Sequence, residues 1–478
     1  MNRELVLAAI VVTVAGCRSA SHDPPAPPAK PTTESALLRE FDGSYPAEVA
    51  KGATVREFDV VAAETVLPLV DGTQMRVWAY NGSVPGPVLR VRLGEAIRVR
   101  FTNKLRQSTT IHWHGVRVPN AMDGVPHVTQ PEIQPGESFV YEFTPKDAGT
   151  FWFHPHIRGS EQLERGLYGV LIVEDASPPP YSRDVVWVLD DWLRDESGQI
   201  IEKFVTPHDL AHDGRWGNVI TTNASTKETL VVGSGDRIRL RLLNTANARV
   251  FRPDFSGLDA KVIAIDGMYL REPISPRGLE LAPGNRIDLD VSFGSGLTNR
   301  VEILDRFIPS SPNHLADIAI GAETAQAPQF ASPAHAHVPK WTEALSSPVF
   351  HDYRLDARRG GLFGIEWTID GVAMQDHADH MQMPSVSLER GKFYRLRFTN
   401  LSARLHPIHT HGMFFRLLAR NGLAVEEPFF RDTALVHAQE TIDVGVVPLD
   451  EGRWMLHCHI QEHAEAGMMT TIDVTSPR

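Results

Sequence analysis

One ten-residue frame occurs three times in this sequence, and this repeat limits the possible folds more than any other feature. Each copy runs from a Gly to an Asn across alternating apolar and polar residues, at Gly94–Asn103, Gly235–Asn244 and Gly391–Asn400. Alternation of this kind is typical of half-buried β-strands. The copies begin 141 and 156 residues apart, so the repeating unit is a whole domain.

A second landmark follows each copy of the frame. It reads Pro135-Gly136-Glu137, then Pro283-Gly284-Asn285, and more loosely Ala438-Gln439-Glu440, and each time an alternating run comes next. Short runs such as Val88–Arg92 and 97–101 lie between Gly, Pro and Asn residues. This pattern favours antiparallel β-sandwiches. We therefore predict an all-β chain of three tandem β-sandwich domains.

The domain limits are set where the alternating runs lapse into Pro-rich or Ala-rich sequence. The prediction is a signal peptide at 1–17, a Pro-rich linker at 18–50, domain one at 51–176, domain two at 181–321, a linker at 322–340 and domain three at 341–478.

The N-terminus has the features of an export signal. Arg3 precedes an apolar run at 5–14 that is too short to span a bilayer. Val14-Ala-Gly-Cys17 resembles the lipobox of bacterial lipoproteins, which implies a lipid anchor at Cys17 and a periplasmic or cell-envelope location. The alternative is an ordinary signal peptide with an incidental Cys. In either case, a net charge of −12 without a basic run argues against nucleic-acid binding.

Histidine pairs occupy the same positions in domains one and three. His112 and His114 stand nine and eleven residues after Asn103, as His409 and His411 do after Asn400. A second set of pairs follows each later landmark, at His154 and His156 and at His457 and His459. Domain two has no His at the corresponding offsets, where Pro253 and Phe255 stand. Since residues two apart share a strand face, these eight imidazoles predict a metal cluster between domains one and three.

A thiolate distinguishes the two domains. Domain three has Cys458 between its last pair of His, whereas domain one has Pro155. With His406, His463 and Met468, this Cys forms the His₂Cys set with a weak axial Met that is typical of blue copper sites. The two sites should lie on opposite sides of one strand. Structural histidines are the alternative, but ten of the 21 His lie in four short motifs at repeated offsets.

These motifs resemble the multicopper oxidases in their three-domain, laccase-like form. The resemblance rests on His112-Trp-His-Gly, His154-Pro-His, His406-Pro-Ile-His-Thr-His-Gly and His457-Cys-His-Ile-Gln-Glu-His463 with Met468, and it covers nearly the whole chain after the linker. It implies three cupredoxin-like Greek-key domains and four copper ions. The implied ligands are His406, Cys458, His463 and Met468 for type 1, His112 and His409 for type 2, and His114, His154, His156, His411, His457 and His459 for type 3. It also implies that four one-electron oxidations of a small reducing substrate are coupled to reduction of O₂ to water.

The resemblance suggests a proton relay as well. Asp123, nine residues after His114, resembles the acidic residue that assists the trinuclear site in bacterial family members; the alternative is a turn Asp before Gly124. Many relatives carry a Glu just after the last type 1 His, where this chain has Ala464. Glu462 and Glu465 are the candidate replacements.

The substrate is predicted to be a phenol or an aromatic amine. A segment with Met374, His377, His380, Met381 and Met383 offers soft ligands and makes oxidation of Cu(I), Mn(II) or Fe(II) the alternative; a polar loop with gap-filling Met explains it equally well. Cuprous oxidases carry Asp and Met before the first type 1 His, where this chain has Leu401-Ser-Ala-Arg-Leu405. A copper-binding scaffold without turnover is a further alternative.

Overall fold

The computed structural model of the chain describes residues 52–294, 300–323, 344–374, 384–427 and 429–477. The signal peptide, Cys17, all of the Pro-rich linker and most of the linker predicted at 322–340 lie outside these residues. So do His377, His380, Met381 and Met383.

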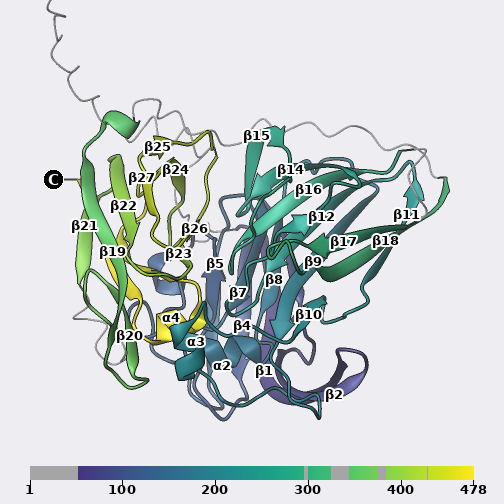
Figure 1. Cartoon of the computed structure of the whole chain (residues 1–478), viewed down its shortest axis with the longest axis horizontal. Helices are drawn as coiled ribbons and strands as arrows, with labels where there is room; N and C mark the ends of the chain where they lie inside the picture. Colours follow the sequence, from purple (N-terminus) through teal and green to yellow (C-terminus); the bar gives the residue numbers. More distant parts are fainter. Residues whose placement is uncertain (1–51, 295–299, 324–343, 375–383, 428, 478) are drawn as a thin grey trace, which may run out of the picture.

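The described residues form six β-sheets, two for each third of the chain (Figure 1). The first third contains β1 (Val55–Leu69), β2 (Thr73–Tyr80), β3 (Val88–Arg92), β4 (Ala96–Asn103), β5 (His112–His114), η1 (Asn120–Met122), β6 (Ser138–Phe143), β7 (Gly149–His154), α2 (Gly159–Glu164) and β8 (Gly169–Glu174). Their sheets have the orders β2-β1-β4-β6 and β3-β8-β7-β5.

The middle third contains β9 (Arg183–Trp192), α3 (Pro207–Ala211), β10 (Val219–Thr222), β11 (Thr229–Ser234), β12 (Arg237–Asn244), β13 (Pro253–Asp254), β14 (Asp259–Ile265), β15 (Met268–Ile274), β16 (Arg286–Ser292), β17 (Arg300–Asp305) and β18 (Asn313–Glu323). Their sheets have the orders β10-β9-β12-β16-β14-β15 and β11-β18-β17-β13.

The last third contains η2 (Ala344–Ser346), β19 (Val349–Arg359), β20 (Ile365–Ile369), β21 (Ser385–Glu389), β22 (Tyr394–Asn400), β23 (His406–Thr410), β24 (Phe415–Arg420), β25 (Leu423–Ala424), β26 (Thr433–Val436), β27 (Thr441–Val446), β28 (Gly452–Cys458), α4 (Gln461–Glu465) and β29 (Met469–Thr475). Their sheets have the orders β20-β19-β22-β27-β24-β25 and β21-β29-β28-β23-β26.

The three pairs of sheets share a common core of strands, to which domains two and three add β14-β15 and β24-β25 at the edge of the first sheet. This confirms the predicted all-β fold of repeated sandwiches. The pairing is not purely antiparallel, however. In each repeat the first strand runs parallel to the strand of the Gly-to-Asn frame, in the pairs β1–β4, β9–β12 and β19–β22. The second sheets contain the parallel pairs β3–β8, β11–β18 and β21–β29. Alternation reports which face of a strand is buried and carries no information on strand direction.

The last residue of the frame explains why the frame is repeated. Asn103, Asn244 and Asn400 are all buried, and each ends its strand in the same way. In the first copy, Asn103 Nδ2 donates to the carbonyls of Gln107 and Ile133, and its Oδ1 accepts from the Leu105 backbone N–H. The other two Asn residues make equivalent bonds: Nδ2 donates to one carbonyl four or five residues later and to a second one far along the chain, and Oδ1 accepts from the backbone N–H two residues later. This side chain folds the loop that leads to the next strand, which carries His112 and His114 in domain one and His409 in domain three.

The later landmark is a turn that requires left-handed backbone. Gly136 and Gly284 adopt φ of 85° and 89°, and Gln439 takes this conformation in domain three with φ of 59°. Gln tolerates that conformation less well than Gly does. The turn is therefore kept in the third copy although its sequence is the least similar.

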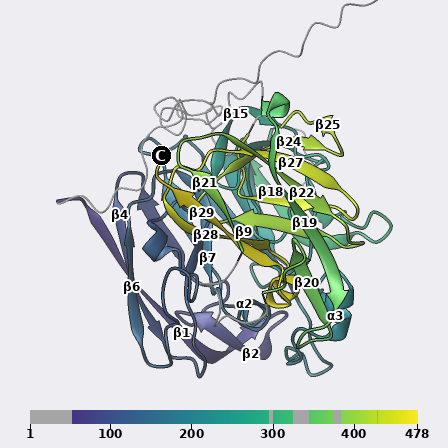
Figure 2. The same ribbon diagram turned by 90° about the vertical axis from the view of Figure 1, so that its left-hand side faces the viewer.

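The three domains pack so that one metal-binding region is shared. Figures 1 and 2 show the yellow-green strands of domain three beside the blue strands of domain one, with α2, α3 and α4 gathered at one end of this junction. α4 contacts both α2 of domain one and α3 of domain two. Among the described residues, no helix has the length and apolar character needed to cross a membrane.

Candidate metal centre

Two pairs of neighbouring strands carry the eight repeated histidines. β5 pairs with β7, which sets His112 opposite His154, and β23 pairs with β28, which sets His409 opposite His457. The remaining ligands lie just beyond the ends of these strands: His156, His411 and His459. The sequence predicted strand on both sides of Cys458, but β28 ends at that residue. All eight rings gather at the junction of domains one and three, seven of them buried and His156 half-buried.

The hydrogen bonds fix which nitrogen of each ring is free to bind a metal. Nδ1 of His112 and Nδ1 of His154 donate to backbone carbonyls at 2.8 Å, and Nδ1 of His409 donates to one at 3.0 Å. The Nε2 atoms of these rings and of His459 are buried without a protein partner. His114 is reversed, because its Nε2 lies 3.2 Å from an oxygen of Asp432 while Nδ1 is unpartnered. Buried polar atoms without partners are rare, and one anchored nitrogen per ring is typical of metal-ligating His. The donor set fits a metal cluster.

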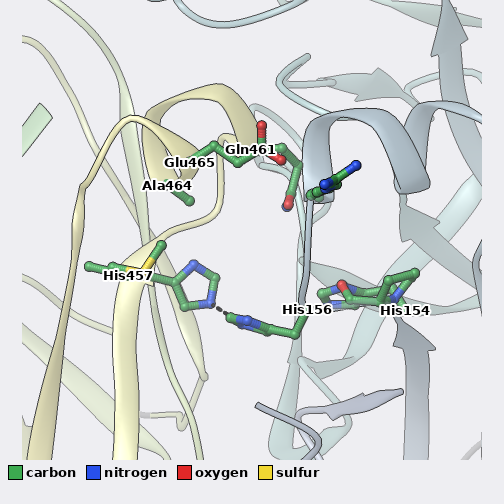
Figure 3. Close-up of a pocket in the computed structure, with 10 residues that line it drawn as sticks. His154, His156, His457, Gln461, Ala464 and Glu465 are labelled. Carbon is green, nitrogen blue, oxygen red and sulfur yellow. Dashed lines mark hydrogen bonds between the residues drawn. The ribbon is translucent and has the colours of Figure 1, made fainter. Parts of the chain in front are cut away.

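Three of the rings converge on one point. Nε2 of His457 lies 3.4 Å from Nε2 of His156 (Figure 3). It also lies 3.2 Å from Nε2 of His411. Nδ1 of His457 donates to the carbonyl of Cys458 and Nδ1 of His411 faces a carboxylate, so their Nε2 atoms carry lone pairs. Lone pairs at this distance repel each other unless a cation lies between them. His112 belongs to two further groups, one with His409 and His411 and one with His114 and His154, in each of which the ligand nitrogens lie within 4.8 Å of one another.

The second set of ligands lies on the other side of β28. Sγ of Cys458 lies 3.6 Å from Nδ1 of His406 and 3.9 Å from Nδ1 of His463, and these two nitrogens are 3.3 Å apart. All three residues and Met468 are fully buried in the core of domain three. The backbone N–H of Cys458 donates to the carbonyl of Met468 at 3.0 Å, which holds the predicted axial residue beside the thiol.

The far nitrogens of the two histidines are also anchored. Nε2 of His406 lies 2.9 Å from the hydroxyl of Ser402, and Nε2 of His463 donates at 3.0 Å to the backbone carbonyl of His212 in domain two. Trp367 packs on both rings, with centroids 4.9 Å from His406 and 4.2 Å from His463. The Nδ1 atoms are therefore oriented toward the sulfur before any metal binds.

Burial prepares both sets of ligands to bind metal. It lowers the pKa of His457 and of His463 to about 3, so these imidazoles are neutral at neutral pH. It lowers the pKa of His114, His154, His406 and His459 as well. Neutral imidazole is the form that binds metals.

Asp123 lies between the predicted type 2 and type 3 ligands. One carboxylate oxygen accepts from Nδ1 of His411 at 2.8 Å and the other is 3.3 Å from Nδ1 of His112. The residue is buried and also ends the short η1 helix, so both interpretations of the sequence describe part of its environment.

A second buried carboxylate at the cluster was missed by the sequence reasoning. Asp432 contacts His114 at 3.2 Å and His409 at 3.5 Å, and Arg286 of domain two binds it at 2.8 Å. Burial acts to raise the pKa of Asp432, but Arg286 and His409 outweigh it and hold this pKa below its usual value. A Cβ at Gly115 would lie 2.5 Å from Asp432 and still closer to Arg286, which explains the Gly in the first His motif. No repeat signal marks Asp432 or Arg286.

Domain two supplies a wall of the cluster although it supplies no ligand. At Gly284 of its turn, a Cβ would come within 2.9 Å of the ring of His114 and 3.0 Å of the ring of His459. In domain two the repeated turn at Gly284 therefore also packs against the cluster histidines. A comparison of the three repeats could not predict this contact.

A narrow cavity of about 30 Å³ leads from the α4 end of the junction to the histidines (Figure 3). His154, His156 and His457 line its inner end, and Ala464 and Glu465 of α4 line its wall. This volume accommodates one or two molecules the size of water. The cavity therefore leaves space for small molecules directly beside three of the cluster histidines.

The two candidate replacements for the Glu missing at position 464 differ in their surroundings. Glu465 faces the cavity, and burial, followed by the charge of Glu462, raises its pKa to about 8. Both carboxylate oxygens of Glu462 accept hydrogen bonds, from the hydroxyl of Ser160 at 2.6 Å, from Nδ2 of Asn247 at 3.0 Å and from the backbone N–H of Arg215 at 3.0 Å. Glu462 thus links the three domains.

Only one member of the Met- and His-containing segment lies among the described residues. Met374 is half-buried against Val125, Met455, Ala464 and Met469, and its backbone N–H donates to Gly467. Its surroundings correspond to the gap-filling alternative.

Two buried donor sets, one of His only and one of His₂Cys, are joined through a single Cys between two His, and they fit a copper-dependent oxidase with cupredoxin-like domains. Sequence profiles described as multicopper oxidase match residues 61–178, 183–295 and 355–478.

Known proteins agree with this class. The chain is 34% identical to a multi-copper oxidase of Pseudomonas thermotolerans of known structure, covering 89% of this chain and 100% of that one, with a TM-score of 0.79. A laccase-like multi-copper oxidase, CueO of Ochrobactrum sp., is 25% identical with a TM-score of 0.74, covering 88% of this chain and 99% of that one. The multicopper oxidase MmcO of Mycobacterium tuberculosis is 27% identical over 93% of this chain and 92% of its own length. This chain belongs to the multicopper oxidase family, whose members bind copper and use O₂ and a reducing substrate.

Proposed function

We propose that this multicopper oxidase is a laccase-like enzyme that oxidises phenols and aromatic amines with four copper ions. The observation that carries the proposal is the convergence of Cys458 with His406 and His463 on one side of β28, with eight histidines on the other. Its proposed ligands are His406, Cys458, His463 and Met468 for type 1, His112 and His409 for type 2, and His114, His154, His156, His411, His457 and His459 for type 3. When bound, the copper ions supply one-electron oxidation of substrate and four-electron reduction of O₂ to two waters.

The protein's part in electron transfer is the connection made by Cys458. Its sulfur faces the His₂Cys set, and its backbone continues directly into His457 and His459. A second connection runs through its carbonyl oxygen, which accepts from Nδ1 of His457 at 2.9 Å. Both connections are short and buried, which supports rapid electron transfer from the His₂Cys site to the cluster. Rapid delivery of electrons avoids the release of partly reduced oxygen.

Asp123 is proposed to move protons to the reacting oxygen. Its contacts with His411 and His112 place one carboxylate beside both proposed kinds of cluster copper. An Asp123→Asn variant should retain its copper and its blue absorption but lose about 10²-fold or more in kcat, the usual range for general acid–base catalysis. Full activity in this variant would leave Asp123 as a turn residue only.

Support for an organic substrate comes from the loop before His406. A cuprous oxidase carries Asp and Met there, whereas in this chain Ser402 bonds to His406 and the Leu405 backbone N–H donates to Asp213 at 2.8 Å. The Ochrobactrum relative is described as active toward lignin model compounds. Metal-ion oxidation is the second candidate, and a copper-binding scaffold is the third.

Oxygen uptake by the copper-loaded enzyme tests these candidates directly. We expect turnover with 2,6-dimethoxyphenol to exceed that with Cu(I), Mn(II) or Fe(II). Faster turnover of Cu(I), lost when Met374, Met381 and Met383 are changed together to Leu, would favour the second candidate. Copper binding without O₂ uptake on any substrate would leave only the scaffold.

We also propose that the protein is exported and anchored to a membrane by a lipid on Cys17. The support is the lipobox-like sequence Val14–Cys17. Labelling of the wild-type protein by radioactive palmitate, and its loss in Cys17→Ser, would test the anchor; an unlabelled wild-type protein would favour an ordinary signal peptide.

A further inference from the structure

Two exposed histidines of domain two lie directly over the His₂Cys site. His208 and His212 stand four residues apart, on and just after the short helix α3, and their ring centroids are 4.2 Å apart. Two His at this spacing share one helix face, the arrangement that chelates a single metal ion. Neither residue belongs to a repeat-related motif.

The pair is held in a form that can bind metal. Nδ1 of His212 donates at 2.8 Å to the carbonyl of His208, so its Nε2 carries a lone pair. Thr206 and Asp209 form a reciprocal capping box at the start of α3, which fixes the helix despite its length.

α3 is anchored to the core of the neighbouring domain. Its Leu210 is fully buried in the same cluster as Cys458 and Met468, and the indole N–H of Trp367 donates at 3.2 Å to the carbonyl of Leu210. Trp367 is also the residue that packs on His406 and His463. The exposed pair therefore has a fixed position relative to the buried ligands.

One hydrogen bond connects the pair to the proposed type 1 site. The carbonyl oxygen of His212 accepts the Nε2–H of His463, and His463 itself is fully buried. An ion on the His212 ring would be separated from the type 1 ligand by the bonds of one residue and this hydrogen bond.

We propose that His208 and His212 bind a reduced transition-metal ion as an electron-donating substrate. Imidazole ligands suit copper and iron, whereas manganese prefers carboxylates, so the expected substrates are Cu(I) and Fe(II) rather than Mn(II). Each ion loses one electron through His212 and His463, and four ions with one O₂ and four protons give two waters. The proposal rests on the proposed oxidase function and adds to it a docking point for metal ions.

The test compares His208→Gln/His212→Gln with the wild-type enzyme and with His351→Gln, a partly exposed His of domain three whose ring contacts Asp370 at 2.7 Å. Calorimetric titration with Zn(II), which is redox-inert, should show a site on the copper-loaded wild type and on His351→Gln that the double variant lacks. In oxygen uptake, the KM for Fe(II) and Cu(I) should rise about tenfold or more in the double variant, the equivalent of about 1.4 kcal/mol. The KM for 2,6-dimethoxyphenol should stay within about twofold, and Zn(II) should compete with the metal ions alone.

The outcomes separate this inference from the proposed function. Equal Zn(II) affinity in the wild type and the double variant, or an unchanged KM for both ions, overturns the inference while phenol oxidation stands. Absence of O₂ uptake on every substrate overturns the oxidase function, and in that case Zn(II) binding still decides whether the pair is a metal site.

Discussion

The ends of β7 and β28 carry the same pair of histidines around different central residues. In both, Nδ1 of the first His donates to the carbonyl of the central residue, at 2.8 Å to Pro155 and 2.9 Å to Cys458. The backbone thus orients the cluster ligand whatever the central side chain is. The side chain of the central residue is therefore not needed for this orientation. In domain three it is a thiol that faces His406 and His463. In the proposed function, this single residue adds electron input to a cluster whose histidines both domains supply in the same way.

Replacing the thiol should break this comparison most completely. Mutation of residues that only support metal ligands typically lowers metal affinity or activity about 10–100-fold. Because Cys458→Ser removes a proposed ligand itself, we expect turnover to fall by more than about 100-fold. The blue absorption should disappear while most of the cluster copper remains, as measured by visible spectra and copper analysis. Pro155→Ala, at the matching position of β7, should keep both colour and turnover. A Cys458→Ser enzyme that oxidises phenols at near the parent rate would contradict the proposed connection.

The comparison extends to the turn of domain two that forms the wall of the cluster. In Gly284→Val the side chain would strike the rings of His114 and His459, and we expect a loss of about 10–100-fold in cluster copper affinity or activity. Gly278 provides the matched control, because it also has positive φ, 75° against 89°, but has open space around it. Gly278→Val thus carries the backbone strain without the clash. Equal copper retention in the two variants would show that the wall is not needed.

Proton release on copper loading should differ between the His₂Cys site and the histidine cluster. Burial raises the pKa of the Cys458 thiol, so the copper-free protein holds this proton at neutral pH. In the cluster, burial lowers the pKa of His154, His457 and His459, so these imidazoles are already neutral and have no proton to lose. Binding at the His₂Cys site should therefore release one proton, and its affinity should rise about tenfold per unit increase in pH near neutrality. A pH-stat titration of the copper-free protein measures this release, and Cys458→Ser should lack it; equal release by both proteins would contradict the assignment.

The sequence predicted the parts of this molecule that repeat. The Gly-to-Asn frame indicated three sandwiches and the repeated His offsets indicated eight imidazoles, because Asn103 and its two counterparts make equivalent local bonds. It could not predict what arises only where domains meet. Asp432 and Arg286 pair across a domain boundary, and His212 reaches His463 through its backbone, which no side-chain pattern records. The alternation of apolar and polar residues also did not predict which strand pairs are parallel.

The smallest effect is expected at the proposed axial ligand, which has no counterpart at the end of β7. Met468→Leu exchanges side chains of similar volume in a buried site, so the free energy of unfolding should change by less than about 1.5 kcal/mol. Removing a thioether that stabilises the oxidised ion should raise the type 1 potential, which redox titration of the blue band measures. Met469→Leu is the matched control, since this neighbour lines the cavity instead. An unchanged potential in Met468→Leu would mean that the thiolate and two imidazoles alone set it, and the contrast between the two strand ends would then reduce to Cys458 and its two histidines.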